Sequence, residues 1–210
     1  MSCNVASEDH PSQTSQKPDV TISPEETFMR LFSQRRSEQI SAIKGILKYE
    51  LKKQEMMVNA VTHKIFDVLK SSRATLESAG YVPGLSQFPE DEKTRDALSN
   101  ILENTSLFGD IVLYIPDIAQ PILANHNEYE VLLKWSLMFM NQTQLLDKKT
   151  VKQMSLVSQE LNITDRNPDY VNPYRKSAQK VAQSEPSTPA PKPKKKKKKL
   201  PRGPRLTEEL

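Results

Sequence analysis

The sequence predicts an all-α protein: a single-domain helical bundle of about five to seven helices over residues 23–174. We expect a disordered N-terminal arm at residues 1–22 and a disordered Pro- and Lys-rich tail at residues 175–210. With five Gly and six each of Phe and Tyr among 210 residues, the composition suits helices better than a sandwich or barrel. Apolar residues between the two polar ends recur at helical spacing. The sequence between the two polar terminal segments is long enough for one domain of roughly 150 residues.

The first predicted helix begins at Ser23, with Pro24 at its first position and Glu26 placed to close a capping box. No Pro follows as far as Ala79, so this section is one long helix or two helices in a hairpin. A globular body favours the hairpin, with a break near Tyr49 to Gln54. Its apolar stripe comprises Phe28, Leu31, Phe32, Ile40, Ile43, Leu47, Met57, Val61, Ile65, Val68, Leu69 and Leu76.

Gly80 is predicted to end that section as a left-handed cap. The next helix is predicted to open at Phe88-Pro89-Glu90-Asp91-Glu92, with its three acids in the first turn, where the helix dipole favours negative charge. Phe108-Gly109-Asp110 is interpreted as a tight joint. The inner stripe of this helix comprises Ala97, Leu98, Ile101, Leu102 and Thr105.

Pro116 and Pro121 are expected to divide the following segment into short pieces. The most apolar predicted helix runs from Glu128 to Met140 and is expected to be central to the core. Within it, Trp135 could line a partner groove, although aromatic residues at helical spacing more often pack in the core. A last helix from about Lys148 to Leu161 should end on Asn162.

The basic charge of the chain is concentrated in the tail. Residues 175–210 carry twelve Lys or Arg against three Glu, whereas residues 1–174 carry eighteen basic and twenty-three acidic side chains. An acidic body argues against a nucleic-acid-binding fold, although the tail alone could bind polyanions. From Pro168 onward, the chain is predicted to be disordered. The polybasic run comprises Lys192, Lys194, Lys195, Lys196, Lys197, Lys198 and Lys199.

The tail holds two conflicting targeting signals. Its Lys run is typical of nuclear import, whereas the ending Thr207, Glu208, Glu209 and Leu210 resembles the Lys-Asp-Glu-Leu signal that retains lumenal proteins in the endoplasmic reticulum. Met1 to Val20 lacks the apolar segment of a signal peptide, so either the chain is not secretory or its leader is missing. No stretch reaches the roughly 20 apolar residues of a membrane span.

No residue pattern indicates catalysis or cofactor binding. His10, His63 and His126 have no Cys or second His at metal-ligand spacing, and the sequence has neither a nucleophile elbow nor a phosphate-binding Gly loop. The single Cys3 excludes an internal disulfide. We therefore expect no enzyme activity, no metal, no cofactor and no small-molecule substrate.

Three sequons are candidate N-glycosylation sites. Asn104 is predicted to lie inside a helix and to be unused. Asn141 is predicted to follow a helix end, which makes it the best acceptor. Asn162 is a further candidate, although a role as a helix cap explains this residue equally well.

An ordered set of short motifs along the chain resembles the coiled-coil domain-containing protein 134 family. The resemblance covers about residues 28–174 and the last eight residues, and none of its motifs is a catalytic fingerprint. The matching residues are Arg35-Arg36, Glu38-Gln39, Asp67 to Lys70, Phe88 to Lys93, Glu103-Asn104-Thr105, Phe108 to Leu113, Trp135, Asn141-Gln142-Thr143, Gln159-Glu160-Leu161, Gly203-Pro204-Arg205 and Glu209-Leu210.

The resemblance implies an all-helical, non-enzymatic protein of the endoplasmic reticulum lumen that is partly secreted. It further implies association with the lumenal chaperone endoplasmin, support of its folding and N-glycosylation at the translocon, and restraint of MAP kinase signalling. The family's Asn141 sequon and Glu209-Leu210 ending are present here, the latter implying a retention receptor as a partner. The pure Lys run departs from the family's mixed stretch, which leaves a nuclear or cytosolic regulator as the alternative.

Overall fold

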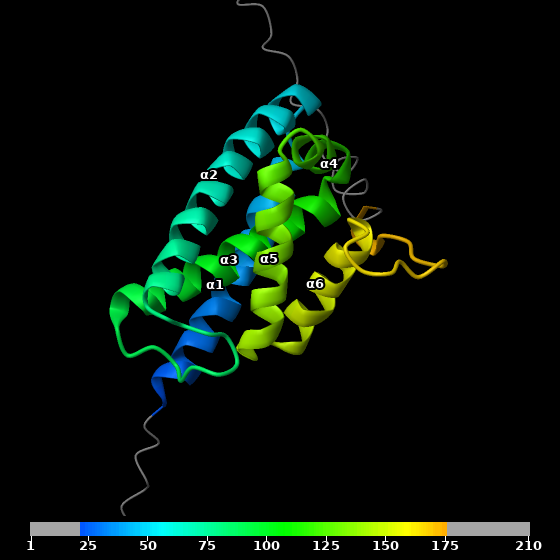
Figure 1. Ribbon diagram of the computed structural model, residues 1–210. Helices are drawn as coiled ribbons and strands as arrows, with labels where there is room; N and C mark the ends of the chain where they lie inside the picture. The colour runs from blue at the N-terminus through cyan, green and yellow to red at the C-terminus, as the bar shows by residue number, and fades with distance from the viewer. Residues whose placement is uncertain (1–21, 176–210) are drawn as a thin grey trace, which may run out of the picture.

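A computed structural model describes residues 22–175 of the chain (Figure 1). These residues form helices and contain no β-strand, which confirms the predicted all-α class. One further helical turn begins at Pro173, at the end of the described residues. The six principal helices are α1 (Pro24–Ile46), α2 (Leu51–Ser78), α3 (Glu92–Tyr114), α4 (Pro116–Ala124), α5 (Asn127–Thr143) and α6 (Lys148–Glu160).

Helix α3 is the centre of the bundle, and each of the other five helices packs against it. Figure 1 shows α2 along one flank and α6 along the opposite flank. The segment from Phe108 to Tyr114 is buried at every position. The prediction that the helix from Glu128 to Met140 would be central is therefore wrong. Helix α5 buries one face only, since Val131 and Met138 remain 64% and 63% exposed.

The break between α1 and α2 spans Leu47 to Glu50, close to the predicted position. The two helices do not form a closely packed hairpin, because each packs chiefly against α3. An apolar stripe on a helix specifies which face is buried but not which neighbour covers it. The location of the break was therefore predictable, and the packing partner was not.

Three predicted helix ends are confirmed by their hydrogen bonds. Ser23 and Glu26 form the capping box, with contacts of 3.1 and 3.2 Å. Gly80 adopts a φ of 67° after α2, and Asn162 adopts a φ of 53° after α6. In both places the next residue donates its N–H back across the last turn, as in a Schellman motif.

The start of α3 differs from the prediction. Asp91 is the N-cap, and its carboxylate accepts a hydrogen bond of 2.8 Å from the Thr94 N–H. Of the three acids expected in the first turn, only Glu92 lies there, because Pro89 and Glu90 precede the helix. The bonds from Thr94 lower the pKa of Asp91. Asp91 therefore acts as a capping residue, which also favours its ionised form.

The predicted joint at Phe108-Gly109-Asp110 is absent, since α3 continues through it to Tyr114. Gly109 instead permits a close approach of α6. A Cβ atom at this position would lie 2.9 Å from the Met154 Cε and 3.0 Å from a Val157 methyl. Gly109 therefore reflects packing between helices rather than a turn.

The prediction that Pro116 and Pro121 both interrupt the helices is confirmed for one of them only. Pro116 starts α4 as its first residue, in agreement with the predicted interruption. Pro121 lies inside α4 and does not divide it. Because α4 has only nine residues, the N–H that Pro121 lacks affects a single turn.

The segment 168–175 belongs to the fold, which agrees with a domain that extends to residue 174 and not with disorder from Pro168 onward. Asn172 is buried and donates a hydrogen bond of 2.8 Å to the Leu113 carbonyl. The Tyr174 ring packs on Tyr114, with their centroids 4.9 Å apart. The contacts of Asn172 and Tyr174, rather than an apolar stripe, therefore hold this segment against the end of α3, which explains why composition did not reveal it.

Within residues 22–175, no single helix has both the length and the apolar character of a membrane span. Helices α3 and α4 meet those criteria only as a pair, and they are bent by 118° where they join.

Candidate partner-binding groove

A groove runs along the surface between α2 and α5, and we call it the α2–α5 groove. It has two compartments, of about 650 and 210 Å³, which share Glu77 in their walls. The larger is lined by Phe66, Asp67, Lys70, Arg73, Ala74, Glu77, Asn127, Glu128, Tyr129, Val131 and Leu132. The smaller is lined by Leu76, Glu77, Tyr81, Val82, Pro83, Trp135, Met138, Phe139 and Gln142.

The α5 wall of the groove is a second, exposed stripe on that helix. On α5, Leu133, Leu137 and Met140 face the core, whereas Val131 and Met138 are exposed along the groove. Because residues three, four and seven positions apart lie on one face of a helix, both walls present their side chains in a line. The groove thus exposes apolar side chains of α5 along its length, opposite a wall of α2 that carries Asp67, Lys70, Arg73 and Glu77.

Trp135 lies at the middle of the groove, half-buried against the core. The Arg73 guanidinium carbon sits 4.6 Å from the centroid of the Trp135 ring. The same Arg73 donates from Nε to Glu77, at 2.7 Å. The ring centroid of Phe139 lies 5.1 Å from that of Trp135. One part of Trp135 therefore contacts the core and another part lines the groove, and the binding of a partner there stays a prediction.

The larger compartment carries two carboxylates, Asp67 and Glu128. Among the described residues, no side chain lies within hydrogen-bond or ion-pair distance of Asp67 or Glu128. Burial raises the pKa of the Tyr129 hydroxyl, and the charges of Asp67 and Glu128 raise that pKa further. This end of the groove therefore has a negative potential that disfavours a phenolate.

Aromatic contacts fix the wall of that compartment. The ring of Tyr129 stacks on Phe66 with centroids 4.1 Å apart, and its hydroxyl lies 2.6 Å from Nδ1 of His63. His126 stacks on the other side of Tyr129, at 4.7 Å. Across residues 22–175, no three His, Cys, Asp or Glu side chains are grouped so as to hold a metal ion. These two histidines therefore pack as aromatic rings.

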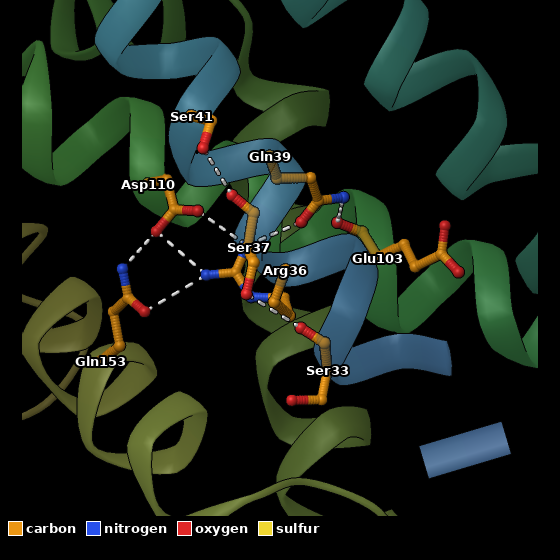
Figure 2. Close-up of polar contacts among 8 residues, drawn as sticks. All are labelled: Ser33, Arg36, Ser37, Gln39, Ser41, Glu103, Asp110 and Gln153. Carbon is orange, nitrogen blue, oxygen red and sulfur yellow. Dashed lines mark hydrogen bonds and ion pairs between the residues drawn. The ribbon is translucent and has the colours of Figure 1, made fainter. Parts of the chain in front are cut away.

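On the other side of α3 lies a buried polar network (Figure 2). Arg36 of α1 binds Asp110 of α3 through two contacts, of 2.7 and 3.0 Å. Gln39 accepts from the same guanidinium at 2.6 Å, and Gln153 of α6 accepts at 3.2 Å. Gln153 also donates to Asp110. The network therefore joins three helices, and it lies on the opposite side of α3 from the groove.

Burial outweighs the attraction of Arg36 at Asp110. Desolvation raises the pKa of Asp110, while the hydrogen bonds and positive charge of Arg36 act in the opposite direction. Both side chains are almost inaccessible, with exposures of 5% and 0%. A buried pair of this kind fixes the relative positions of helices more than it adds stability.

The sequence pattern did not reveal this network, because Arg35-Arg36 forms only a polar interruption of the apolar stripe. The signal that could have found it was Asp110, a lone acid in an otherwise buried run of α3. A charged residue at such a position requires a partner of opposite charge. The rotation of α1 about its axis decides which arginine pairs with Asp110. Arg36 faces Asp110, whereas the adjacent Arg35 pairs with Glu103.

The three sequons lie in different surroundings. Asn104 is half-buried in the middle of α3 and donates to the Asn100 carbonyl at 2.9 Å. Asn141 is exposed in the last turn of α5, so the expectation that it follows the helix end is wrong. Its sequon hydroxyl, on Thr143, is buried and donates to a backbone carbonyl at 2.8 Å. In the Asn162 sequon both the Asn and the Thr are exposed.

The remaining predicted sites lie outside the described residues. These are His10, Cys3, the retention-like ending Thr207, Glu208, Glu209 and Leu210, and the polybasic residues Lys192, Lys194, Lys195, Lys196, Lys197, Lys198 and Lys199.

Known proteins match this chain over most of its length. The sequence model of a family described as "ERK and JNK pathways, inhibitor" matches residues 12–207. Coiled-coil domain-containing protein 134 of Xenopus tropicalis is 35% identical over 152 residues, covering 71% of this chain and 66% of that protein. The Mus musculus protein of the same name is 33% identical over 150 residues, covering 70% and 65%. No solved structure matches the chain.

The matched region thus spans just under two thirds of the length of both curated relatives. The family description names the inhibition of two pathways and no reaction. The extent of the family match and the two identities agree with the resemblance inferred from the sequence motifs. The chain therefore belongs to the coiled-coil domain-containing protein 134 family, described as an inhibitor of the ERK and JNK pathways.

Proposed function

We propose that the protein is a non-enzymatic interaction protein that restrains ERK and JNK signalling by holding a partner protein in the α2–α5 groove. The family description supports the pathway. The groove supports the mode of action, because it offers exposed apolar side chains and a half-buried Trp as a binding surface. A protein of this kind inhibits by occupying its partner rather than by chemical modification.

The observation that carries this proposal is the exposed apolar stripe of α5. Val131 and Met138 are more than half exposed on a helix whose opposite face is buried. Folding alone gains nothing from large apolar groups in solvent, and contiguous patches of this kind are typical of interaction sites. Val82, which lines the smaller compartment, adds to the patch with an exposure of 47%.

We further propose that the partner is met in the endoplasmic reticulum lumen, and that it includes an endoplasmin-type chaperone together with the translocon or glycosylation machinery. The Asn162 sequon at the surface and the exposed Asn141 side chain are compatible with glycan attachment. The ending Thr207 to Leu210 would be read by a retention receptor, and incomplete retention would explain partial secretion.

The test uses cells that express the full chain behind an added secretory leader. Phosphorylated ERK and JNK are measured after stimulation, and the chaperone is sought in pull-downs. We expect the wild type to lower both phosphorylation signals. Met138→Glu should abolish this effect, whereas Val151→Glu should not, because Val151 is 44% exposed on α6, away from the groove. Equal signalling with and without the protein would contradict the proposal.

Deletion of Thr207 to Leu210 tests the location. The truncated chain should appear in the medium in a larger amount than the wild type, because the receptor reads a free carboxyl terminus. Glycosidase treatment of the retained protein should reduce its mass, and Asn141→Gln and Asn162→Gln should identify the sites. Equal secretion of both forms would contradict retention.

The Lys run favours a second candidate, a nuclear or cytosolic regulator that uses it for import and for binding polyanions. Expressed without a leader, that protein should enter the nucleus, and replacement of Lys194 to Lys199 by Gln should leave it in the cytosol. Nuclear entry together with loss of the signalling effect on that replacement would favour this candidate over the lumenal one.

A further inference from the structure

We propose that the α2–α5 groove takes one amphipathic α-helix of its partner. This helix would run antiparallel to α5 and place Lys or Arg of its last turn against Asp67 and Glu128. The inference rests on the proposed function, since it specifies the partner chemistry of the same site. Three properties of the groove support it: its length, its division into compartments and the distribution of its charges.

The length of the groove matches a short helix. Its lining runs from Asn127 to Gln142 on α5 and from Phe66 to Glu77 on α2. At 1.5 Å per residue these walls are about 22 and about 16 Å long, which accommodates a helix of about 11 to 15 residues. An extended strand would instead need an exposed sheet edge, and residues 22–175 contain no strand.

The two compartments favour a ligand helix that carries apolar residues along one face. Arg73 and Trp135 meet across the groove and separate the larger compartment from the smaller one. A ligand helix with apolar residues at positions i, i+4 and i+7 would place anchors on both sides of this crossing. Val131 and Met138, seven residues apart on α5, flank the crossing in the same way.

The charges define the direction of the ligand. Among the described residues, Asp67 and Glu128 have no hydrogen-bond or ion-pair partner, and together with Glu77 they outnumber the two cations of the lining, Lys70 and Arg73. The first turn of α5 lies at that same end. The negative end of a ligand helix is favoured beside the positive end of α5, and cations are favoured in the last turn of a helix. Both effects select the antiparallel orientation with a basic C-terminal turn.

The chain carries its own reporter for the test, because Trp135 is its single Trp. The probe is a synthetic, Trp-free helical peptide of about 14 residues, with leucine at its third, seventh and tenth positions and arginine at its last two. Its titration into the full chain should shift the Trp emission in a saturable manner. A matched peptide ending in two glutamates should bind at least about tenfold more weakly at low salt.

Variants separate the charge contribution from the apolar one. In the full chain, Asp67→Lys combined with Glu128→Lys should reverse the preference between the two peptides. Met138→Glu should remove the emission shift, and Val151→Glu should leave it unchanged. Circular dichroism establishes that each variant is folded, and the charge reversal is a gain of binding that a misfolded variant cannot produce.

Three results would overturn the inference: no emission shift up to about 1 mM peptide, equal binding of the two peptides by the wild type, or an unchanged shift in the Met138→Glu variant. The titration involves no signalling readout. Failure here with normal inhibition of ERK and JNK would therefore reject the helical ligand alone, whereas normal peptide binding without inhibition would reject the proposed function.

Discussion

The two sides of α3 differ in what they bury and what they expose. On one side, α6 closes over Gly109 and encloses the Arg36–Asp110 pair. On the other side, α2 and α5 leave Trp135 and Met138 at a groove that the described chain does not fill. Charges are thus buried where they have partners, and apolar groups are exposed where they do not. The closed side positions helices, and the open side is available to a partner.

The same contrast separates two adjacent residues of α1. Arg35 and Arg36 both pair with α3, but the Arg35 side chain is 58% exposed and that of Arg36 is 5% exposed. The Arg35–Glu103 pair gains little from its attraction, because water still solvates the Arg35 guanidinium, although the Glu103 side chain is only 13% exposed. A buried pair gains little as well, yet the loss of either partner leaves an unsolvated charge.

The largest effect should follow from breaking the closed side. Arg36→Met leaves Asp110 buried without its counter-ion and should lower the free energy of unfolding by about 3–5 kcal/mol. Urea denaturation of the full chain, followed by circular dichroism, measures this loss. Arg35→Ala is the matched control and should cost no more than about 1 kcal/mol.

The double variant Arg36→Met, Asp110→Leu sharpens this interpretation. It removes both charges and should recover most of the stability lost in the single variant. A double variant as unstable as Arg36→Met would show that the network contributes net stability rather than position alone.

Two glycines test the close contact of α3 with α6. Gly109→Ala introduces a methyl group beside Met154 and Val157, and it should destabilise the fold by about 1–3 kcal/mol through overpacking. Gly45→Ala, in α1 with no atom within 4 Å of the new Cβ, should instead stabilise it by up to about 1 kcal/mol. Thermal unfolding distinguishes the two, and equal shifts in Tm would contradict the packing role of Gly109.

Two carboxyls, one within α3 and one at its N-cap, should respond to pH in opposite directions. The pKa of Asp110 is raised above its ordinary value of 3.8, so its contribution to stability is present below that value and lost as the pH rises through the folded pKa. The pKa of Asp91 is lowered, so its contribution is present above 3.8 and lost as the pH falls through the folded pKa.

The measurement compares the wild type with Asp110→Asn and with Asp91→Asn, from about pH 3 to about pH 7. The stability of the wild type relative to Asp110→Asn should fall with rising pH, and relative to Asp91→Asn it should rise. The same slope for both pairs would contradict the difference between a desolvated carboxyl and a capping carboxyl.

The smallest effect on stability should come from the open side. Met138→Ser and Val131→Ser should change the free energy of unfolding by no more than about 0.5 kcal/mol, because both side chains are mostly exposed. The same variants should weaken partner binding. A loss of stability comparable to that of Arg36→Met would mean that these residues belong to the core and not to a binding surface.

Features of this fold that depend on residues close in sequence were predictable, and features that depend on residues far apart in sequence were not. The caps at Ser23, Gly80 and Asn162 depend on residues within one turn, and the sequence alone located them. The central role of α3, the helical state of Gly109 and the order of the segment after Pro168 depend on contacts across the bundle. No local pattern encodes these contacts, and the sequence-based expectations about them were wrong.

The candidate site was predictable only in part. Trp135 could be singled out as core or groove, and the structure shows that it contributes to both. The pairing of α2 with α5 around it was not accessible, because both walls are helical stripes whose facing partners depend on tertiary packing. The acids Asp67 and Glu128 are remote in sequence and become one electrostatic feature only in the folded bundle.

The central position of α3 affects how the chain folds while it is being synthesised. Helices α1, α2 and α3 leave the ribosome first, and Arg36 and Asp110 are then present without Gln153, which α6 supplies from beyond Lys148. Until α6 emerges, Gly109 and its apolar neighbours lie uncovered. We therefore expect a nascent intermediate in which one side of α3 is exposed. Because α6 completes the core late, this apolar surface is open to aggregation or to binding by other proteins until α6 is synthesised.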